Sequence, residues 1–147
     1  MKKNILFGLL LILLTACGGN AQKNNAQVTE TETKEQVADA STVNVYYFHG
    51  KQRCKTCIAV GDVTEKAIKE LYASNPHVKY IEVKTDEEQN ASLVEKYEVT
   101  WNALIITKGD NHIEITKEAF ANAINNPKAL TELIVKQVEN YELGITN

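Results

Sequence analysis

The chain beyond residue 41 contains short apolar runs whose spacing alternates between the period of strands and the period of helices. Residues 42–48 (TVNVYYF) combine β-branched and aromatic side chains, which predicts a buried strand. Apolar residues then recur at helical spacing over residues 54–74, and the Asn-Pro pair at 75–76 ends the predicted helix. Residues 77–85 (HVKYIEVKT) predict a second strand.

The following segment predicts a short helix and a hairpin. Thr85 and Glu88 (TDEE) have the spacing of a capping box for the short helix. Residues 103–107 (ALIIT) and 112–116 (HIEIT) predict two strands. The intervening KGDN supplies the turn residues of a hairpin between them.

The last part of the chain predicts a helix in two pieces. A short helical stretch covers residues 117–124, and Asn126 with Pro127 supplies an N-cap and a first-turn proline for a longer helix that Gly144 ends. The predicted order is therefore β-α-β-α-β-β-α with a split final helix. A β-α-β crossover makes the first two strands parallel and the hairpin adds antiparallel strands, so we expect an α/β domain over residues 42–147.

The N-terminal residues 1–16 have the pattern of a secretory signal: two lysines, an apolar run of about a dozen residues and small residues. The run is too short for a membrane-spanning helix, which needs about 20 residues. Residues 14–17 (LTAC) resemble the lipobox of bacterial lipoproteins. The resemblance implies cleavage before Cys17, acylation of its sulfur and attachment to a membrane. The alternative is a secreted protein with an unmodified cysteine near its cleavage site.

Residues 17–41 are rich in Asn, Gln, Thr, Glu and Ala and contain almost no large apolar residue. Such a segment buries too little surface to offset its ordering entropy, so we expect a flexible tether after the lipidated cysteine. Cleavage removes Lys2 and Lys3, which leaves 14 basic and 19 acidic residues and a net charge of −5. This acidic balance gives no basic face for nucleic acid, and we expect no nucleic-acid partner.

If Cys17 carries lipid, Cys54 and Cys57 are the two remaining cysteines of an exported, oxidising setting. A CxxC motif beside a β-α-β pattern is typical of thioredoxin-like proteins. The chain resembles the thioredoxin superfamily by element order over about residues 43–143, and by motif at Cys54-Lys55-Thr56-Cys57. The resemblance implies a thioredoxin-like fold, with a mixed central sheet flanked by helices, and a redox pair that works without a cofactor.

Thiol exchange needs one cysteine that ionises near neutral pH and a second that resolves the mixed disulfide. At a helix start the first sulfur faces unpaired backbone N–H groups, so we predict Cys54 as the exposed attacking thiolate and Cys57 as the more buried resolving thiol. Lys51, Arg53 and Lys55 place positive charge near Cys54. The alternative is that these basic residues belong to a solvated loop, in which their charges are screened.

Three positions depart from the thioredoxin pattern. The family carries a buried acid six residues before the first cysteine, where this chain has Phe48, and an aromatic residue directly before that cysteine, where it has Arg53. The family's cis-proline faces the disulfide, and the matching stretch here offers Trp101 or Asn102. We predict that Arg53, Trp101 and Asn102 tune the cysteines or form the substrate groove. Lys55 and Thr56, between the cysteines, are candidates for the same roles.

Three functions remain open from the sequence. The first is a membrane-tethered, extracytoplasmic thiol-disulfide oxidoreductase, anchored in a bacterial cell envelope with its domain facing the periplasm or the exterior. Its partners would be thiols and disulfides of exported proteins, with a thiol-carrying membrane protein as an electron source. The second is a copper-binding chaperone or sensor lipoprotein in which His49, Cys54 and Cys57 bind Cu(I). The third is an interaction domain with a structural disulfide.

Overall fold

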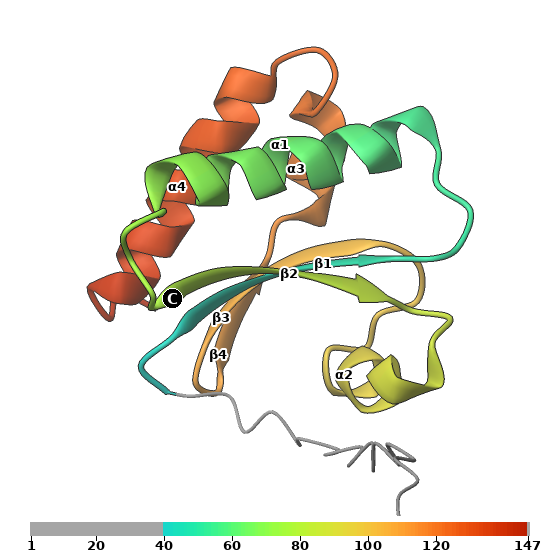
Figure 1. Ribbon diagram of the computed structural model, residues 1–147, viewed down its shortest axis with the longest axis horizontal. Coiled ribbons are helices and arrows are strands. Elements are labelled where there is room, and N and C mark those ends of the chain that lie inside the picture. Colours follow the sequence, from blue (N-terminus) through green and yellow to red (C-terminus); the bar gives the residue numbers. More distant parts are fainter. Residues whose placement is uncertain (1–39, 147) are drawn as a thin grey trace, which may run out of the picture. The chain divides into compact units, whose positions relative to one another are not determined.

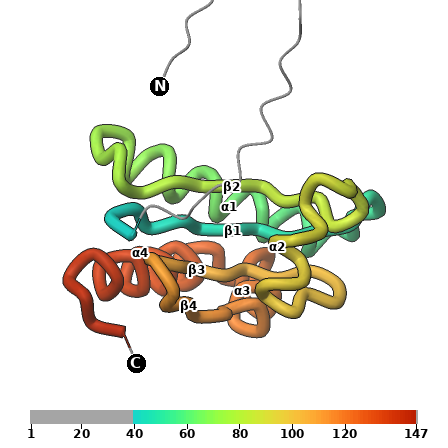
Figure 2. Tube along the Cα trace, turned by 90° about the horizontal axis from the view of Figure 1, so that it is seen from below, coloured from blue at the N-terminus to red at the C-terminus, as the bar shows by residue number. Residues whose placement is uncertain are grey.

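A four-stranded mixed sheet forms the centre of the computed structural model, which describes residues 40–146. The strands β1 (Val43–His49), β2 (Val78–Lys84), β3 (Ala103–Lys108) and β4 (Asn111–Glu114) lie in the order β2-β1-β3-β4 (Figure 2). β1 is parallel to β2 and antiparallel to β3, and β3 is antiparallel to β4. The predicted parallel crossover and antiparallel hairpin are therefore confirmed.

Helices cover both faces of the sheet (Figure 1). The helices α1 (Lys55–Leu71), α3 (Thr116–Asn122) and α4 (Pro127–Glu142) pack on one face. The short helix η1 (Glu88–Asn90) and α2 (Ala91–Lys96) lie on the other. The predicted α/β fold, with a mixed central sheet flanked by helices, is confirmed. Within residues 40–146, no helix is both long enough and apolar enough to cross a membrane.

Side-chain alternation along β1 divides the core into two clusters. Val45 and Tyr47 point into the larger cluster, against α1, α3 and α4, whereas Tyr46 and Phe48 point into the smaller one, against α2. All seven residues of β1 are buried, which confirms the prediction of a buried strand. The larger cluster also contains these fully buried residues: Val60, Leu104, Ile106, Leu130, Ile134 and Val138.

Two predicted boundaries are wrong. Thr85 and Glu88 form no capping box, because the side chain of the α2 N-cap residue, Asn90, instead donates to the carbonyl oxygen of Lys84. The fourth strand ends at Glu114, and α3 begins at Thr116, whose Oγ1 accepts a hydrogen bond from Leu104 N at 2.9 Å. The contact of Thr116 with β3 thus accompanies the start of α3, and the local sequence pattern does not predict this contact.

The last helix begins and ends where the sequence predicts. The Asn126 side chain accepts a hydrogen bond from Ala129 N at 3.2 Å, Pro127 stands in the first turn, and Gly144 follows the helix with φ of 75°. Predictions for residues 1–16, Cys17 and most of the tether lie outside the described residues and stay predictions.

Candidate functional site

The cysteine pair lies where the chain passes from β1 into α1. Cys54 is the N-cap residue of α1, and its Sγ accepts a hydrogen bond from Cys57 N at 3.1 Å. Cys54 and Cys57 form a disulfide, with their Cα atoms 5.0 Å apart. Cys54 is exposed and Cys57 is 4% exposed. The predicted difference in exposure is therefore present, whereas the assignment of attacking and resolving roles stays a prediction.

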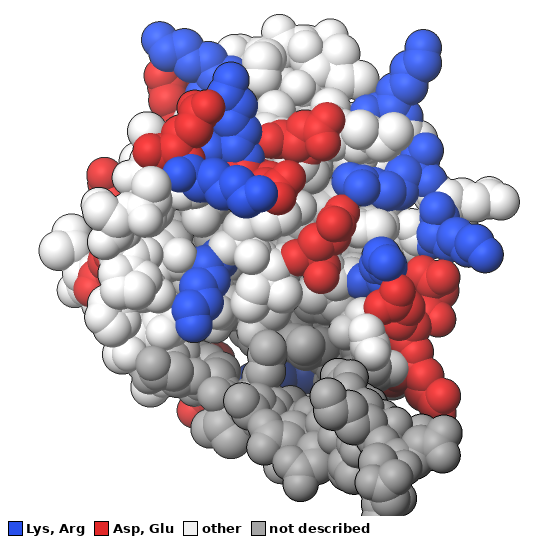
Figure 3. All heavy atoms as spheres, viewed as in Figure 1, with Lys and Arg blue, Asp and Glu red and all other residues white. Residues whose placement is uncertain are grey.

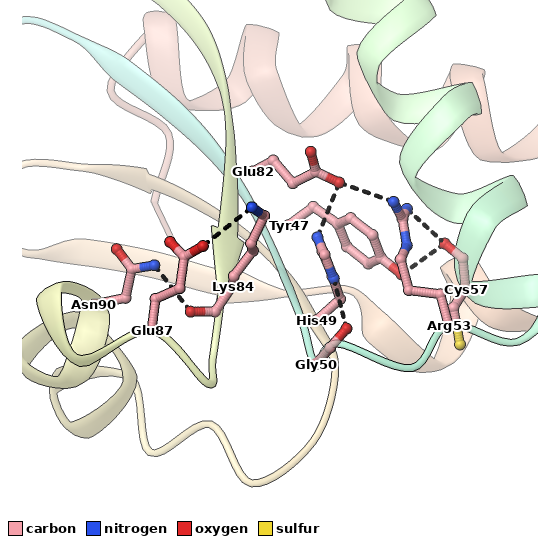
Figure 4. A network of polar contacts seen from close by, with 9 residues as sticks. All are labelled: Tyr47, His49, Gly50, Arg53, Cys57, Glu82, Lys84, Glu87 and Asn90. Atoms are coloured by element: carbon pink, nitrogen blue, oxygen red, sulfur yellow. Dashed lines mark hydrogen bonds and ion pairs between the residues drawn. The ribbon is translucent and has the colours of Figure 1, made fainter.

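The carbonyl oxygen of Cys57 is the centre of a polar network beneath the disulfide (Figure 4). The buried Tyr47 hydroxyl donates to this oxygen at 2.7 Å, and Arg53 Nη2 donates to it at 3.3 Å. Burial raises the pKa of Tyr47, although the nearby Arg53 charge acts in the opposite direction. The phenol therefore remains a neutral hydrogen-bond donor at neutral pH.

The structure changes the interpretation of Phe48. Sequence spacing matches Phe48 to the family's buried acid, but its side chain packs in the α2-side cluster, on the opposite face of the sheet from α1. Tyr47 occupies the face beneath the cysteines and contacts Cys57. The reason is geometric, because successive residues of a strand face opposite sides and an offset of one residue exchanges the two faces.

Arg53 turns its guanidinium toward the protein. Nη1 donates to Glu82 Oε1 at 3.0 Å, and Cζ lies 5.5 Å from the centre of the Tyr47 ring. The side chain is 24% exposed, so Arg53 is not the fully solvated loop residue of the alternative interpretation. Lys51 and Lys55 are exposed, and Thr56 is half-buried. The effect of these residues on Cys54 stays a prediction.

Asn102 and Trp101 differ sharply in position. Asn102 Nδ2 lies 4.0 Å from Cys57 Sγ, so its amide contacts the buried sulfur of the pair. The Trp101 side chain is 80% exposed. Of the two residues that the sequence offers at the family's proline position, Asn102 is therefore the one in contact with the disulfide.

The His49 imidazole is directed toward β2. Its Nδ1 lies 2.9 Å from the Gly50 carbonyl oxygen, and its Nε2 lies 2.9 Å from Glu82 Oε1 in ion-pair range but outside hydrogen-bond geometry. Among residues 40–146, no group of three or more His, Cys, Asp or Glu side chains is arranged to hold a metal ion. The disulfide joins the sulfurs of Cys54 and Cys57, and the alternative Cu(I) set of His49, Cys54 and Cys57 stays a prediction.

Sequence reasoning did not identify Tyr47, Gly61 and Glu82 as members of the site. Glu82 belongs to β2 and lies next to β1, where the register pairs it with Tyr47. A Cβ at Gly61 would stand 2.5 Å from Arg53 Nη2 and 3.2 Å from Tyr47 Cε1. A glycine inside a predicted helix costs about 1 kcal/mol against alanine. The unfavourable glycine at position 61 was therefore the feature of the sequence that indicated a close approach of another group to the helix.

Comparisons with known proteins find similarity of structure. No protein-family model matches the chain, and no curated protein matches it in sequence. The zinc-bound form of human ERp44 superposes with a TM-score of 0.53 at 17% identity, covering 73% of this chain and 29% of that one. Form I of human ERp44 gives 0.53 at 19% identity, covering 74% and 28%. Form II gives 0.52 at 16% identity, covering 84% and 33%.

The chain thus spans about a third or less of the length of these ERp44 structures. ERp44 is a thioredoxin-fold protein, and the mixed sheet with its flanking helices matches it. The described part of the chain has a thioredoxin-like fold with a disulfide at the start of its first helix.

Proposed function

We propose that this protein is a thiol-disulfide oxidoreductase that is tethered to a bacterial membrane and exchanges disulfides with exported proteins. The observation that carries the proposal is the asymmetric cysteine pair at the N-terminus of α1. Cys54 is exposed to solvent, where a protein substrate can approach it, whereas Cys57 is buried. The hydrogen bond from Cys57 N to Cys54 Sγ favours negative charge on Cys54.

The exchange reaction follows from this asymmetry. A substrate thiolate attacks Cys54 Sγ, the Cys54–Cys57 bond breaks, and Cys57 leaves as a thiolate that Asn102 Nδ2 contacts at 4.0 Å. A second substrate thiolate then attacks its partner sulfur in the mixed disulfide and expels Cys54. The substrate is oxidised by two electrons, the Cys54–Cys57 pair is reduced by two, and Cys57 takes up a proton. The reverse sequence reduces a substrate disulfide.

The membrane tether rests on the residue pattern at Cys17, and the fold is compatible with it. Residue 42 precedes the first residue of β1, and the cysteine pair follows the last, so about 20 Å of strand separates the point of chain entry from the disulfide. The start of α1, which carries the cysteine pair, lies at the far end of β1 from residue 42 (Figure 1).

Trapping a mixed disulfide tests the exchange function. In the full chain, Cys57→Ser removes the resolving thiol, so we expect a covalent complex between Cys54 and a disulfide-bonded substrate peptide. Cys54→Ser is the matched control and traps no peptide. In glutathione buffers the wild-type pair should titrate between about −120 and −270 mV. A potential well below about −300 mV with an unreactive Cys54 indicates a structural disulfide and contradicts the proposal.

Incorporation of labelled fatty acid tests the tether. Bacteria that express the full chain should label it with radioactive palmitate, and Cys17→Ala should lose the label and release the protein from the membrane fraction. Wild-type protein that remains unlabelled and soluble contradicts the tether and leaves the exchange function intact.

Acidic side chains lie among the basic ones over much of the face that Figure 3 shows, and basic side chains gather toward its upper right. The net charge of −5 that we expect after cleavage disfavours nucleic acid as a partner.

A further inference from the structure

The side chain directly before the reactive cysteine is bound to the protein at three points. Arg53 donates to the Cys57 carbonyl at 3.3 Å and to Glu82 at 3.0 Å, and its guanidinium lies over the Tyr47 ring at 5.5 Å. These partners come from α1, β2 and β1, respectively. Arg53 therefore links the first turn of α1 to both parallel strands (Figure 4).

Gly61 provides the space that this guanidinium occupies. It stands one helical turn after Cys57, and an added Cβ would approach Arg53 Nη2 to 2.5 Å. The Tyr47 ring is also close, at 3.2 Å from that Cβ. Glycine in a helix interior is unfavourable by itself, so its presence at this point is explained by the access it gives Arg53 to the Cys57 carbonyl.

A single carboxylate holds the Arg53 guanidinium on the β2 side. Glu82 Oε1 lies 3.0 Å from Arg53 Nη1 and 2.9 Å from His49 Nε2, so the carboxylate faces two side chains. The other ring nitrogen of His49 lies 2.9 Å from the Gly50 carbonyl oxygen. The ion pair with Glu82 therefore fixes the position of the Arg53 charge beside the helix start.

We propose that Arg53 is a positioning residue that holds the first turn of α1 and a positive charge in place when the disulfide is reduced. In the oxidised protein the Cys54–Cys57 bond itself fixes this turn. Reduction removes that bond and leaves Arg53 and Tyr47 to hold the Cys57 carbonyl, so that Cys57 N continues to face the Cys54 thiolate. Arg53 thus stabilises the reduced form more than the oxidised form. This inference rests on the proposed exchange function.

Gly61→Ala is the sharpest test because it displaces the guanidinium without removing any charge. The nearest atom that the added Cβ meets is the end of the flexible Arg53 side chain, so Arg53 can swing away and the helix is retained. The Tyr47 ring, at 3.2 Å, needs to shift by only a few tenths of an ångström. Arg53→Met removes the charge, and Arg53→Lys keeps the charge but loses the planar pair of donors. Lys66→Met is the control, because Lys66 is a 72% exposed cation elsewhere on α1.

Two measurements on the full chain report on the reduced state. The first is the pH midpoint of Cys54 alkylation, followed by mass spectrometry of the Cys54 peptide. The second is the equilibrium constant with glutathione. We expect Arg53→Met and Gly61→Ala to raise the midpoint by about half a pH unit and to shift the equilibrium toward the disulfide about threefold. Arg53→Lys should fall between these variants and the wild type, and Lys66→Met should match the wild type.

The outcomes separate this inference from the proposed function. The positioning role is overturned if Arg53→Met and Gly61→Ala both keep the wild-type pH midpoint of Cys54 alkylation and the wild-type equilibrium constant with glutathione. It is also overturned if only Arg53→Met shifts these values, because the charge would then act regardless of its position. A Cys57→Ser protein that traps no substrate peptide counts against the exchange function, while the pH midpoint of Cys54 alkylation in the wild type still tests Arg53. Circular dichroism checks that each variant is folded. If Gly61→Ala does not fold, Arg53→Lys replaces it as the variant that keeps the charge but loses the contacts.

Discussion

Replacing Tyr47 with Phe measures how strongly the Cys57 carbonyl is held from below. The substitution keeps the buried ring and the Arg53 contact and removes only the hydroxyl that donates at 2.7 Å. A neutral intramolecular hydrogen bond contributes about 0.5–1.5 kcal/mol net. Because Arg53 Nη2 still donates to the same oxygen, the carbonyl is not left unpaired. We therefore expect a loss of about 1 kcal/mol in the free energy of unfolding.

Urea unfolding of the full chain, followed by far-UV circular dichroism, gives this loss directly. With a slope of about 1–3 kcal/mol/M, the midpoint should fall by about 0.3–1 M at unchanged slope. Tyr46→Phe is the matched control, because Tyr46 is the neighbouring buried tyrosine of β1 and packs in the α2-side cluster. If Tyr47→Phe is no more destabilising than Tyr46→Phe, the hydrogen bond to Cys57 has no structural value and the reasoning is refuted.

The same pair of proteins gives a pH dependence with a definite sign. Burial raises the pKa of Tyr47 above its unfolded value of about 10, so the neutral hydroxyl stabilises the folded state fully below that pH. This stabilisation is lost as the pH rises through the folded pKa. The difference in stability between wild type and Tyr47→Phe should stay constant from about pH 5 to 9 and shrink above about pH 10. A difference that grows above pH 10 contradicts this assignment.

Three further substitutions test local features of the fold by the same unfolding measurement. Glu98 has φ of 51°, a conformation that glycine adopts without strain. Glu98→Gly should therefore stabilise the protein by about 1 kcal/mol, and a destabilised variant would contradict the assigned backbone conformation. Asn126→Ala removes the N-cap of α4 and should cost about 1 kcal/mol, whereas Asn126→Ser should retain most of that stability. Lys108→Met removes the ammonium that donates to the Tyr141 and Glu142 carbonyls, at 3.0 and 3.1 Å, at the C-terminal end of α4. The free energy of unfolding should fall by about 1 kcal/mol, and an unchanged value would show that Lys108 does not stabilise this helix end.

The fold was predictable because its elements are specified by local patterns. Apart from Asn44, the run at 42–48 is apolar or β-branched because β1 is covered on both faces. Asn126 and Pro127 supply the N-cap and the first-turn proline of α4. The cysteine pair was predictable for the same reason, since two residues of separation on one helix fix its geometry. Thr85 and Glu88 failed as a capping box because Asn90 bonds back to the end of β2 instead.

The rest of the site depended on contacts between segments distant in the sequence. Glu82 contacts Arg53 across a separation of 29 residues. The register of β1 with β2 places Glu82 beside Tyr47, and so within reach of the loop that carries Arg53. The face of β1 that lies beneath the cysteines depends on the path of the loop before Cys54. Counting residues back from Cys54 along the sequence does not reveal that path. This is why Phe48 was matched to the position that Tyr47 occupies.

Tyr47 at this position has a consequence for proton transfer during exchange. The resemblance to thioredoxins implies a buried carboxylate near the cysteines that accepts the proton of the resolving thiol. The buried phenol of Tyr47, whose pKa is raised by burial, instead donates at neutral pH and accepts no proton. Glu82 does not replace that carboxylate, because it is 41% exposed and already paired with Arg53 and His49. Tyr47 and Arg53 donate to the Cys57 carbonyl, so they hold the backbone and do not face a sulfur. The donors that face the sulfurs are the Cys57 backbone N–H, toward Cys54, and the Asn102 amide, toward Cys57. In the proposed exchange these two donors stabilise the thiolates, and Tyr47 supplies no internal base.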